Sequence, residues 1–474
     1  MTVSIQSIDS ESRGADYLHG SALLLLLVGV CLILLGLLLS QFAAPAVVFG
    51  IIALLVSCFV VPSRWPCGAL LVLFIASALP RVKVEIGGWN ARPEHCAALL
   101  VLLVFLFRWM FHESPRISLT GTDYWVAAYV VWNYVSSGWM SPDPKLTLRW
   151  ALLNNLVVLP YFLIRIVVTD ERLLRWAFRA FIAIGIAECA FAVMAYASRQ
   201  IFRTSFGTEV DQYAGGLGGV YGTQYEPNLL GSCAGCVSIM LLVLYFLSDR
   251  KPRWLIGGII IGLTALLVSL SRGAFLGFAL VSMAIVLVGV RAGLVSAKKL
   301  LLLGLIVTFF VTPIAATVGK NLLSRFVSLS AEEVQNDAEA MGRLVAWSAA
   351  LEDIVQHPWV GNGTASFQLL ADAKQLPILG DRPWVGNSPV RILHDTGVIG
   401  LFLMGAVVVG IGRNVWGVIK GKGQGREIVL VLTSGCLVYT IAFMSTEGTM
   451  LSFFWVHMGL LASACSLAKG AAAG

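Results

Sequence analysis

The sequence predicts an all-α polytopic membrane protein with about 12 to 14 transmembrane helices and a large, partly helical outer loop. Of its 474 residues, 58% are hydrophobic and only 12% are charged, whereas about a quarter of the residues of soluble proteins are charged. Apolar runs of about 20 residues, the length that crosses a hydrocarbon core of roughly 30 Å, recur along nearly the whole chain. The bilayer is therefore the main solvent of this protein.

The individual spans follow from these apolar runs. Met1 to Gly20 is polar and mixed in charge, and the run after it is long enough to span, so we expect a retained first span and no cleaved signal peptide. The run at 66–79 is short, and the opening hairpin is expected to be tilted or partly embedded. The expected spans are 21–40, 43–62, 66–79, 95–111, 122–139, 150–168, 174–197, 228–247, 254–270, 273–290, 298–317, 389–412, 427–445 and 449–468.

The orientation follows from the basic residues of the short connectors, which gather on the cytoplasmic side of membrane proteins. When the spans are counted along the chain, four connectors rich in Lys and Arg fall on the same side of the membrane. They lie near residues 172–175, 250–253, 291–299 and 413–426. We expect both termini to join them in the cytoplasm. The outer face then receives connections 80–94, 199–227 and 318–388 and the turn around Glu447, and function is expected there.

The longest outer loop, 318–388, is expected to be ordered. Ser330 and Glu333 fit a capping box at the start of a helix that ends before Pro358. The whole chain is interpreted as one integral membrane domain, 1–474, because no internal repeat or low-complexity linker divides it. The helix in the loop is amphipathic, with Met341, Leu344, Trp347, Leu351, Ile354 and Val355 on one face.

Composition offers little support for metal or nucleic-acid binding. Cys233 and Cys236 form a CxxC, but they lie inside an apolar span with no second Cys or His pair near them, so we interpret them as packing residues. Asp337 and Glu339 diverge on a helix start. The net charge of +7 follows from the positive-inside rule. We therefore expect no metal, no cofactor and no nucleic-acid partner.

Two arginines at the expected outer boundary are candidates for binding phosphate. Arg272 lies in SRGAFLG, 271–277, where it interrupts two apolar runs, and Arg343 lies on the amphipathic helix. Paired, charge-assisted hydrogen bonds from arginine suit phosphate oxygens. Alternatively, Arg272 anchors its helix at the headgroups and Arg343 forms a surface salt bridge with Glu339.

Two further segments bring ionisable groups to helix ends. WVGNSPVRILHDTGVIGLF, 384–402, re-enters the membrane and carries Arg391, His394 and Asp395. A histidine beside a carboxylate is typical of a general base, although such groups are also common at membrane interfaces. The glycine-rich loop 215–222 leads to YEPNLLG, in which Glu226 and Asn228 flank a span start that favours anions. Helix capping by Asn228 is the alternative.

Taken in order, these segments resemble the O-antigen ligase and O-antigen polymerase family over about residues 225–402. The resemblance implies a membrane enzyme that transfers a glycan from undecaprenyl pyrophosphate to a glycolipid or glycan acceptor without a metal. It further implies that Arg272 and Arg343 engage the pyrophosphate. In the family a histidine precedes the asparagine of the re-entry motif, here Asn387, but this chain has Gly386 at that position.

The chemistry expected from the residues agrees with this resemblance. Displacement of a pyrophosphate needs its developing negative charge to be stabilised, which arginines can do, and Arg391 is a third candidate for this role. It also needs a base that accepts the proton of the acceptor hydroxyl. We rank Glu226 first as the base, then His394, then Asp395. The alternatives are a polymerase that lengthens the lipid-linked glycan and, from another class, a flippase or small-solute transporter that uses Glu188 within a span.

Overall fold

The computed structural model describes residues 65–81, 84–86, 89–111, 119–202, 219–248, 252–291, 338–374, 384–421 and 425–473. Every predicted apolar run within these residues coincides with a helix, so the predicted all-α polytopic class is confirmed. The expected spans 21–40, 43–62 and 298–317, and the expected capping box of Ser330 and Glu333, lie outside the described residues. The helices are α3 (Trp65–Ser77), α4 (Pro93–Phe111), α5 (Gly121–Trp139), α6 (Pro144–Val167), α7 (Glu171–Phe202), α8 (Pro227–Leu247), α9 (Arg253–Ser269), α10 (Arg272–Arg291), α13 (Ala338–Gln356), α14 (Phe367–Ala373), α15 (Ser388–Lys420), α16 (Arg426–Ala442) and α17 (Ser452–Ala473).

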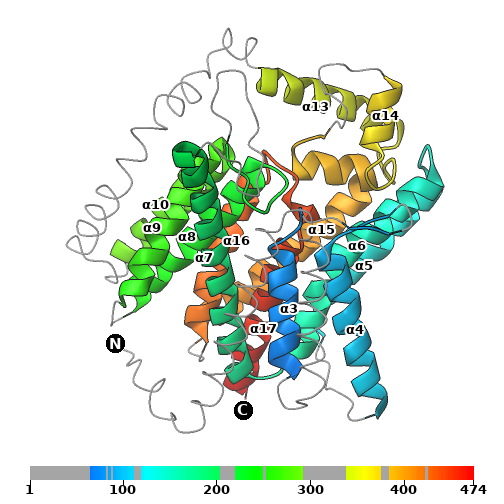
Figure 1. The fold of residues 1–474 in the computed structure, drawn as a ribbon. Coiled ribbons are helices and arrows are strands. Elements are labelled where there is room, and N and C mark those ends of the chain that lie inside the picture. Colours follow the sequence, from blue (N-terminus) through cyan, green and yellow to red (C-terminus); the bar gives the residue numbers. More distant parts are fainter. Residues whose placement is uncertain are drawn as a thin grey trace.

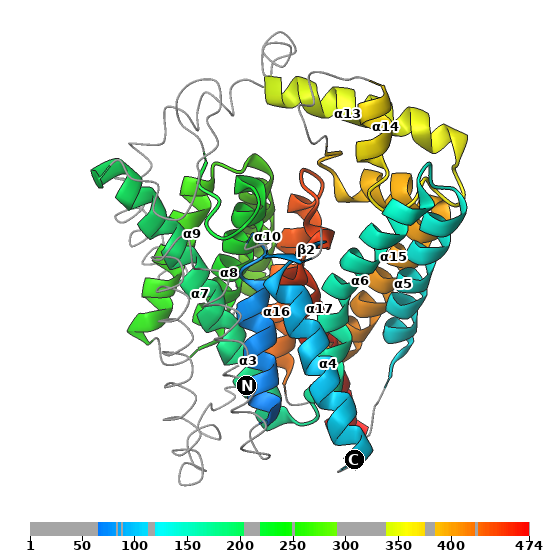
Figure 2. The same ribbon diagram turned by 45° about the vertical axis from the view of Figure 1, so that its right-hand side comes forward.

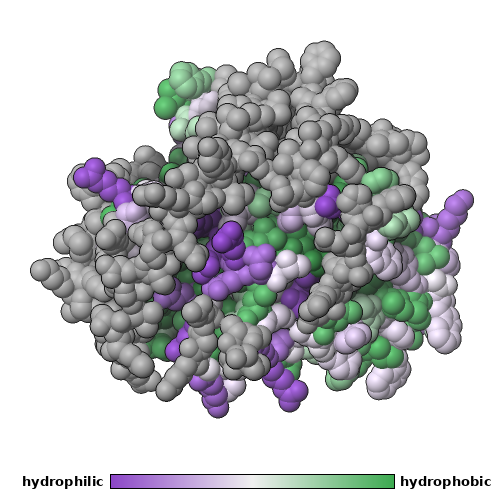
Figure 3. All heavy atoms as spheres, turned by 90° about the horizontal axis from the view of Figure 1, so that it is seen from below, coloured by the Kyte–Doolittle hydropathy of each residue, from purple (hydrophilic) through white to green (hydrophobic). Residues whose placement is uncertain are grey.

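Most helices form one bundle, and α13 and α14 lie across one end of it (Figures 1 and 2). Five of the described helices, α4, α6, α7, α8 and α15, are long and apolar enough to cross a membrane. A short antiparallel hairpin of β1 (Val84–Ile86) and β2 (Trp89–Ala91) precedes α4, which the sequence did not predict. Hydrophilic residues also gather at the end opposite α13, beside hydrophobic ones (Figure 3).

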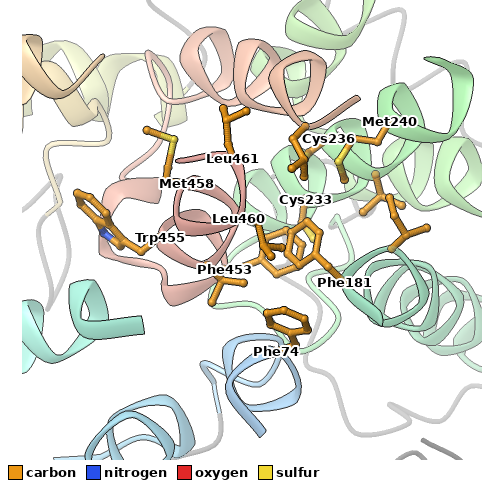
Figure 4. Packing of buried hydrophobic residues seen from close by; sticks show 14 of the residues in the cluster. Phe74, Phe181, Cys233, Cys236, Met240, Phe453, Trp455, Met458, Leu460 and Leu461 are labelled. Atoms are coloured by element: carbon orange, nitrogen blue, oxygen red, sulfur yellow. The ribbon is translucent and has the colours of Figure 1, made fainter. Parts of the chain in front are cut away.

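Helix α8 is at the centre of the bundle, because 94% of its most apolar window is buried and it packs against α9, α16 and α10. Helix α17 supplies much of the neighbouring core, in which the Phe453 ring stacks on Phe181 of α7 at 4.8 Å between centroids. Cys233 and Cys236 point into this apolar packing beside Met240 (Figure 4). This surrounding matches the packing role predicted for the CxxC pair.

Helix α15 is broken at Gly397, whose backbone has φ 66° and ψ −170°. The break exposes backbone groups that an unbroken helix would satisfy, and the segment HPWVGNG, 357–363, satisfies them. Amides of Asn362 and Gly363 donate to the carbonyls of His394 and Asp395, each at 2.9 Å, and the amide of Val398 donates back to Pro358 O at 2.8 Å. The hydrogen bonds between the two segments thus orient the first turns of α15.

The apolar face predicted for the outer-loop helix is partly exposed in the structure. Helix α13 ends at Gln356, as expected, but Leu344, Leu351 and Val355 are exposed. Its buried face is built instead from small residues, among them Ala346 and Ala350, and from Asp353. Small side chains let α13 pack against α15, and its alanines share an apolar cluster with Phe367 and Ala371 of α14.

Candidate active site at the turn between α16 and α17

The turn between α16 and α17, residues 443–447, brings together predicted site residues from distant parts of the chain. Arg343 Nη1 of α13 donates to the carbonyl of Ser445 at 3.1 Å. The hydroxyl of the next residue, Thr446, donates to the carboxylate of Glu226. The carboxylate of Glu447 then accepts from Arg391 Nη1 at 2.6 Å. Three successive residues of one turn therefore contact one predicted site residue each.

Arg272 lies beside the same turn. It is the first residue of α10, and its neighbour Gly273 packs so closely on the turn that a Cβ atom there would overlap Ser445 Oγ. The segment that carries Arg272 thus packs on the same turn to which Arg343, the other arginine expected to bind pyrophosphate, donates. Both residues are half-buried.

Glu226 is placed by the loop that precedes α8. It occupies the N-cap position of α8, with Pro227 as the first helical residue, and the loop before it is tied down where Val220 N donates to Val268 O at 3.0 Å. The residue is half-buried. Asn228 therefore does not cap α8, as one interpretation of the sequence had it, but lies one residue inside the helix.

Glu188 of α7 supports this loop. Its carboxylate accepts hydrogen bonds from Thr223 N at 3.2 Å and Thr223 Oγ1 at 2.6 Å, and Gly222 lies so close that a Cβ would come within 2.9 Å of Glu188 Oε1. The buried carboxylate expected for a transport pathway is thus bonded to the segment that positions Glu226. Hydrogen bonds of this kind offset the cost of burying a polar group.

The start of α15 is joined to the same turn. Asn387 caps α15 by accepting from Val390 N at 3.0 Å and donates from its amide to Met444 O at 2.8 Å. Gly386 donates its backbone N–H to Glu447 Oε1 at 2.9 Å. Its φ of +67° lies in the left-handed region, and a Cβ there would face Arg343 Cγ at 4.0 Å. The position that holds a histidine in the family thus points toward Arg343.

Arg391, His394 and Asp395 form a buried chain of ion pairs on the first turns of α15. Arg391 Nε lies 3.2 Å from Asp395 Oδ2, while His394 Nδ1 lies 3.0 Å from Asp395 Oδ1. His394 Nε2 faces Asp353 Oδ2 of α13 at 3.4 Å. Both ring nitrogens of His394 therefore face carboxylates, an arrangement that favours the doubly protonated, cationic ring.

The outer end of this chain of ion pairs is the pair of Asp353 with Lys374, in which Oδ1 and Nζ lie 2.8 Å apart. Burial by itself would raise the pKa of Asp353, but hydrogen bonds from His394 and Lys374 outweigh it and lower that pKa. Burial likewise opposes the charge on Lys374, and hydrogen bonding to Asp353 reverses this and raises its pKa. The chain fastens α13, which carries Arg343, onto α15.

A second basic cluster lies beside Glu226. Arg92 Nη1 is 2.8 Å from Glu94 Oε1 and donates to the Tyr225 hydroxyl at 3.2 Å. Burial raises the pKa of Tyr225 to about 12, so the phenol remains a neutral donor. The Arg81 guanidinium lies 4.3 Å from the centroid of the Tyr221 ring. The tyrosines around Glu226 are therefore engaged with arginines of the β1–β2 region.

Sequence reasoning missed the residues that join the site. Ser445, Thr446 and Glu447 were placed on the outer face by topology but were assigned no role, because nothing local marks them. The only available signal was polar residues, STEG, between two apolar runs at a boundary expected to face outward. Among the described residues, no group of three or more His, Cys, Asp or Glu side chains could hold a metal ion.

Fold and site together define a polytopic membrane protein with arginines and carboxylates gathered at one end of its helical bundle. Residues 257–405 match the family model described as O-antigen ligase. This match supports the predicted resemblance to the O-antigen ligase and polymerase family, and it includes the segments of Arg272, Arg343 and Arg391. No curated protein sequence matches the chain.

Proposed function

We propose that this protein transfers a glycan from undecaprenyl pyrophosphate to an acceptor sugar, at the outer face of the bacterial inner membrane and with both termini in the cytoplasm. The observation that supports this most is the convergence of Glu226, Arg272 and Arg343 on the single turn 445–447. A pyrophosphate leaving group needs cationic donors, and the acceptor hydroxyl needs a base, within one site. The acceptor is a glycolipid or a glycan, with ligation and polymerisation both open.

Arg272 and Arg343 are the residues that bind the pyrophosphate in this proposal. They approach Ser445 from two helices, so a phosphate group between them would receive hydrogen bonds from both guanidinium groups. As the bond to the anomeric carbon breaks, negative charge accumulates on the leaving pyrophosphate, and the two cations stabilise it. Arg391 acts differently, because its guanidinium is already paired with Asp395 and Glu447. We assign it to holding the turn in place.

Glu226 is the proposed general base. Its carboxylate is half-buried and is oriented by the Thr446 hydroxyl, so it can accept the proton of an acceptor hydroxyl as that oxygen attacks the anomeric carbon. His394 and Asp395 rank below it, because His394 is fully buried between two carboxylates and Asp395 is paired with Arg391. A proton acceptor must be within hydrogen-bond reach of the substrate, which favours the accessible carboxylate.

The test uses the full-length protein in lipid nanodiscs with undecaprenyl-pyrophosphate-linked glycan from its host. We expect Arg272→Ala and Arg343→Ala each to reduce donor consumption by about 100-fold or more, and Glu226→Gln to reduce it comparably. Arg426→Ala is the matched control, since Arg426 is exposed at the start of α16. Product size distinguishes ligation from polymerisation, and turnover in excess chelator tests independence of metal.

Two results would contradict the proposal. If the wild type consumes no donor with either acceptor class, the protein is not this transferase, and uptake assays on Glu188→Gln then test the transporter alternative. If donor consumption is normal in Glu226→Gln while Arg272→Ala abolishes it, the base is another group. Thr446→Val offers a finer check, because loss of one orienting hydrogen bond is expected to slow turnover about tenfold without abolishing it.

A further inference from the structure

The connection between α3 and α4 holds the loop that leads into α8. Arg81 N donates to Thr223 O at 3.2 Å. The hydroxyls of Thr223 and Tyr225 donate to backbone carbonyls of the same connection, those of Ala78 and Pro80 respectively. Two connections that are far apart in the sequence are thus joined by hydrogen bonds to alternate residues of the loop.

Arg92, at the end of the α3–α4 connection, also holds Tyr225. Its Nη1 donates to the Tyr225 hydroxyl at 3.2 Å, and the same nitrogen lies 2.8 Å from Glu94 Oε1. The Arg92 guanidinium lies 5.6 Å from the centroid of the Tyr225 ring. The Glu94 side chain is 1% exposed and that of Arg92 is 14% exposed. The ion pair is therefore largely removed from water, and breaking it would leave a buried charge unpaired.

Tyr225 directly precedes the proposed general base. Glu226 has extended backbone angles, φ −149° and ψ 158°, and Pro227 starts α8 directly after it. Earlier in the loop, Gly222 has a φ of +55°, and glycine gives a chain more conformational freedom than any other residue. Restraint of the backbone before Glu226 must therefore come from contacts such as those of Tyr225.

Different elements hold the two sides of the base. The Tyr225 side chain bonds to the α3–α4 connection, whereas the Glu226 carboxylate accepts from Thr446 of the turn between α16 and α17. A shift of the loop would move the carboxylate relative to that turn, and a misplacement of about 1 Å can lower a rate by about 100-fold. We infer that Tyr225 and Arg92 are positioning residues, which fix the Glu226 carboxylate where it accepts the proton of the acceptor hydroxyl. The inference rests on the proposed function.

The contacts of Arg92 distinguish it from Arg272 and Arg343. Its charge is paired with the buried Glu94, and the Tyr225 hydroxyl accepts the hydrogen bond that it donates. A phosphate bound there would compete with that carboxylate for the same nitrogen. Arg92 therefore acts through Tyr225 rather than on the leaving group, and its loss should lower kcat without weakening the binding of the donor.

The test compares Tyr225→Phe, Arg92→Gln and Arg92→Lys with the wild type in the donor-turnover assay. Tyr225→Phe removes only the hydroxyl and its hydrogen bonds, and Tyr124→Phe is the matched control, since Tyr124 is 63% exposed on α5. We expect Tyr225→Phe and Arg92→Gln to lower kcat about tenfold with little change in the KM for the donor. Arg92→Lys should recover part of the loss, because a single nitrogen, Nη1, contacts both Tyr225 and Glu94.

A double variant separates positioning of the base from a general structural role. If Tyr225 acts through Glu226, adding Tyr225→Phe to Glu226→Gln should lower the residual turnover by less than about twofold. A general loss of structure would lower it by the same factor as in the wild type. Hydrogen exchange of the amides of 219–226, which needs no turnover, should be faster in Tyr225→Phe than in Tyr124→Phe.

The possible failures are distinguishable. If the wild type consumes donor but Tyr225→Phe has normal kcat, or if its full effect persists in the Glu226→Gln background, the positioning role is wrong and the proposed function stands. If the wild type consumes no donor, the proposed function fails and the positioning role fails with it. Thermal unfolding checks each variant, and Tyr225→Phe alone decides the matter if Arg92→Gln does not fold.

Discussion

Replacement of Gly397 by alanine tests whether the break in α15 depends on the segment 357–363. The backbone of Gly397, at φ 66° and ψ −170°, lies in a region essentially restricted to glycine, and strain there costs about 1 to 3 kcal/mol. A Cβ would overlap the carbonyl of Trp359 and come within 2.6 Å of Val360 N. Both contacts are with backbone, which cannot rotate away as a side chain can.

The overlap is expected to push the segment off α15. That movement would break the hydrogen bonds from Val398 N to Pro358 O, at 2.8 Å, and from Ile399 N to Trp359 O, at 3.3 Å, each worth about 1 kcal/mol. With the strain, we expect Gly397→Ala to destabilise the region by roughly 3 to 5 kcal/mol. Gly405 of the same helix is the control, since a Cβ there has no neighbour within 4 Å, so Gly405→Ala should be neutral or slightly stabilising.

The assay is thermal and denaturant unfolding of the purified protein in detergent, followed by tryptophan fluorescence, together with protease cleavage of the segment 357–363. We expect Gly397→Ala to unfold roughly 5 °C or more below the control and to be cleaved faster. Donor turnover should fall as well, because the first turns of α15 position the turn 443–447. If the two variants unfold within about 1 °C of each other, the segment does not hold the break and the reasoning is wrong.

Two further predictions concern the ion pairs. Asp353→Asn should loosen α13, seen as faster hydrogen exchange of its amides at pH 7, whereas Glu352→Gln, at an exposed neighbour, should not. Because the folded pKa of Asp353 is lowered from 3.8, its stabilisation is complete above that ordinary value and is lost as the pH falls through the folded pKa. The wild type should therefore exchange like Asp353→Asn only in strong acid, and equal exchange at pH 7 would contradict this. Arg391→Met should destabilise the protein by about 3 to 5 kcal/mol, since it leaves buried carboxylates unpaired, and addition of Glu447→Gln should recover part of the loss in denaturant unfolding; no recovery would argue against their pairing.

Much of the fold was predictable because a bilayer imposes simple rules on the chain. Backbone groups must be satisfied internally within the hydrocarbon, so runs of about 20 apolar residues become helices. The helix α13 and its end before Pro358 followed from local periodicity and from proline geometry in the same way. The buried face of α13 could not be predicted in this way, because its Ala and Asp residues are buried only by packing against α15.

The candidate site, too, was predictable from the sequence only in part. Arg272, Arg343 and Glu226 were identifiable from sequence, because charged groups at the mouths of apolar helices stand out against their surroundings. Their common partner, the turn 445–447, was not, because it follows Glu226 by more than two hundred residues and carries no local signature.

The sequence by itself determined that the chain spans a membrane, where most of its helices begin and end, and which ionisable residues lie at helix ends. Only the tertiary structure decided that Arg391 and His394 are enclosed by carboxylates, that Glu188 supports the loop of Glu226, and that the glycines of 357–363 complete a broken helix. The physical reason is that hydrophobicity and backbone conformation act over a few neighbouring residues. Ion pairing and hydrogen bonding across the bundle depend on which helices the packing places side by side.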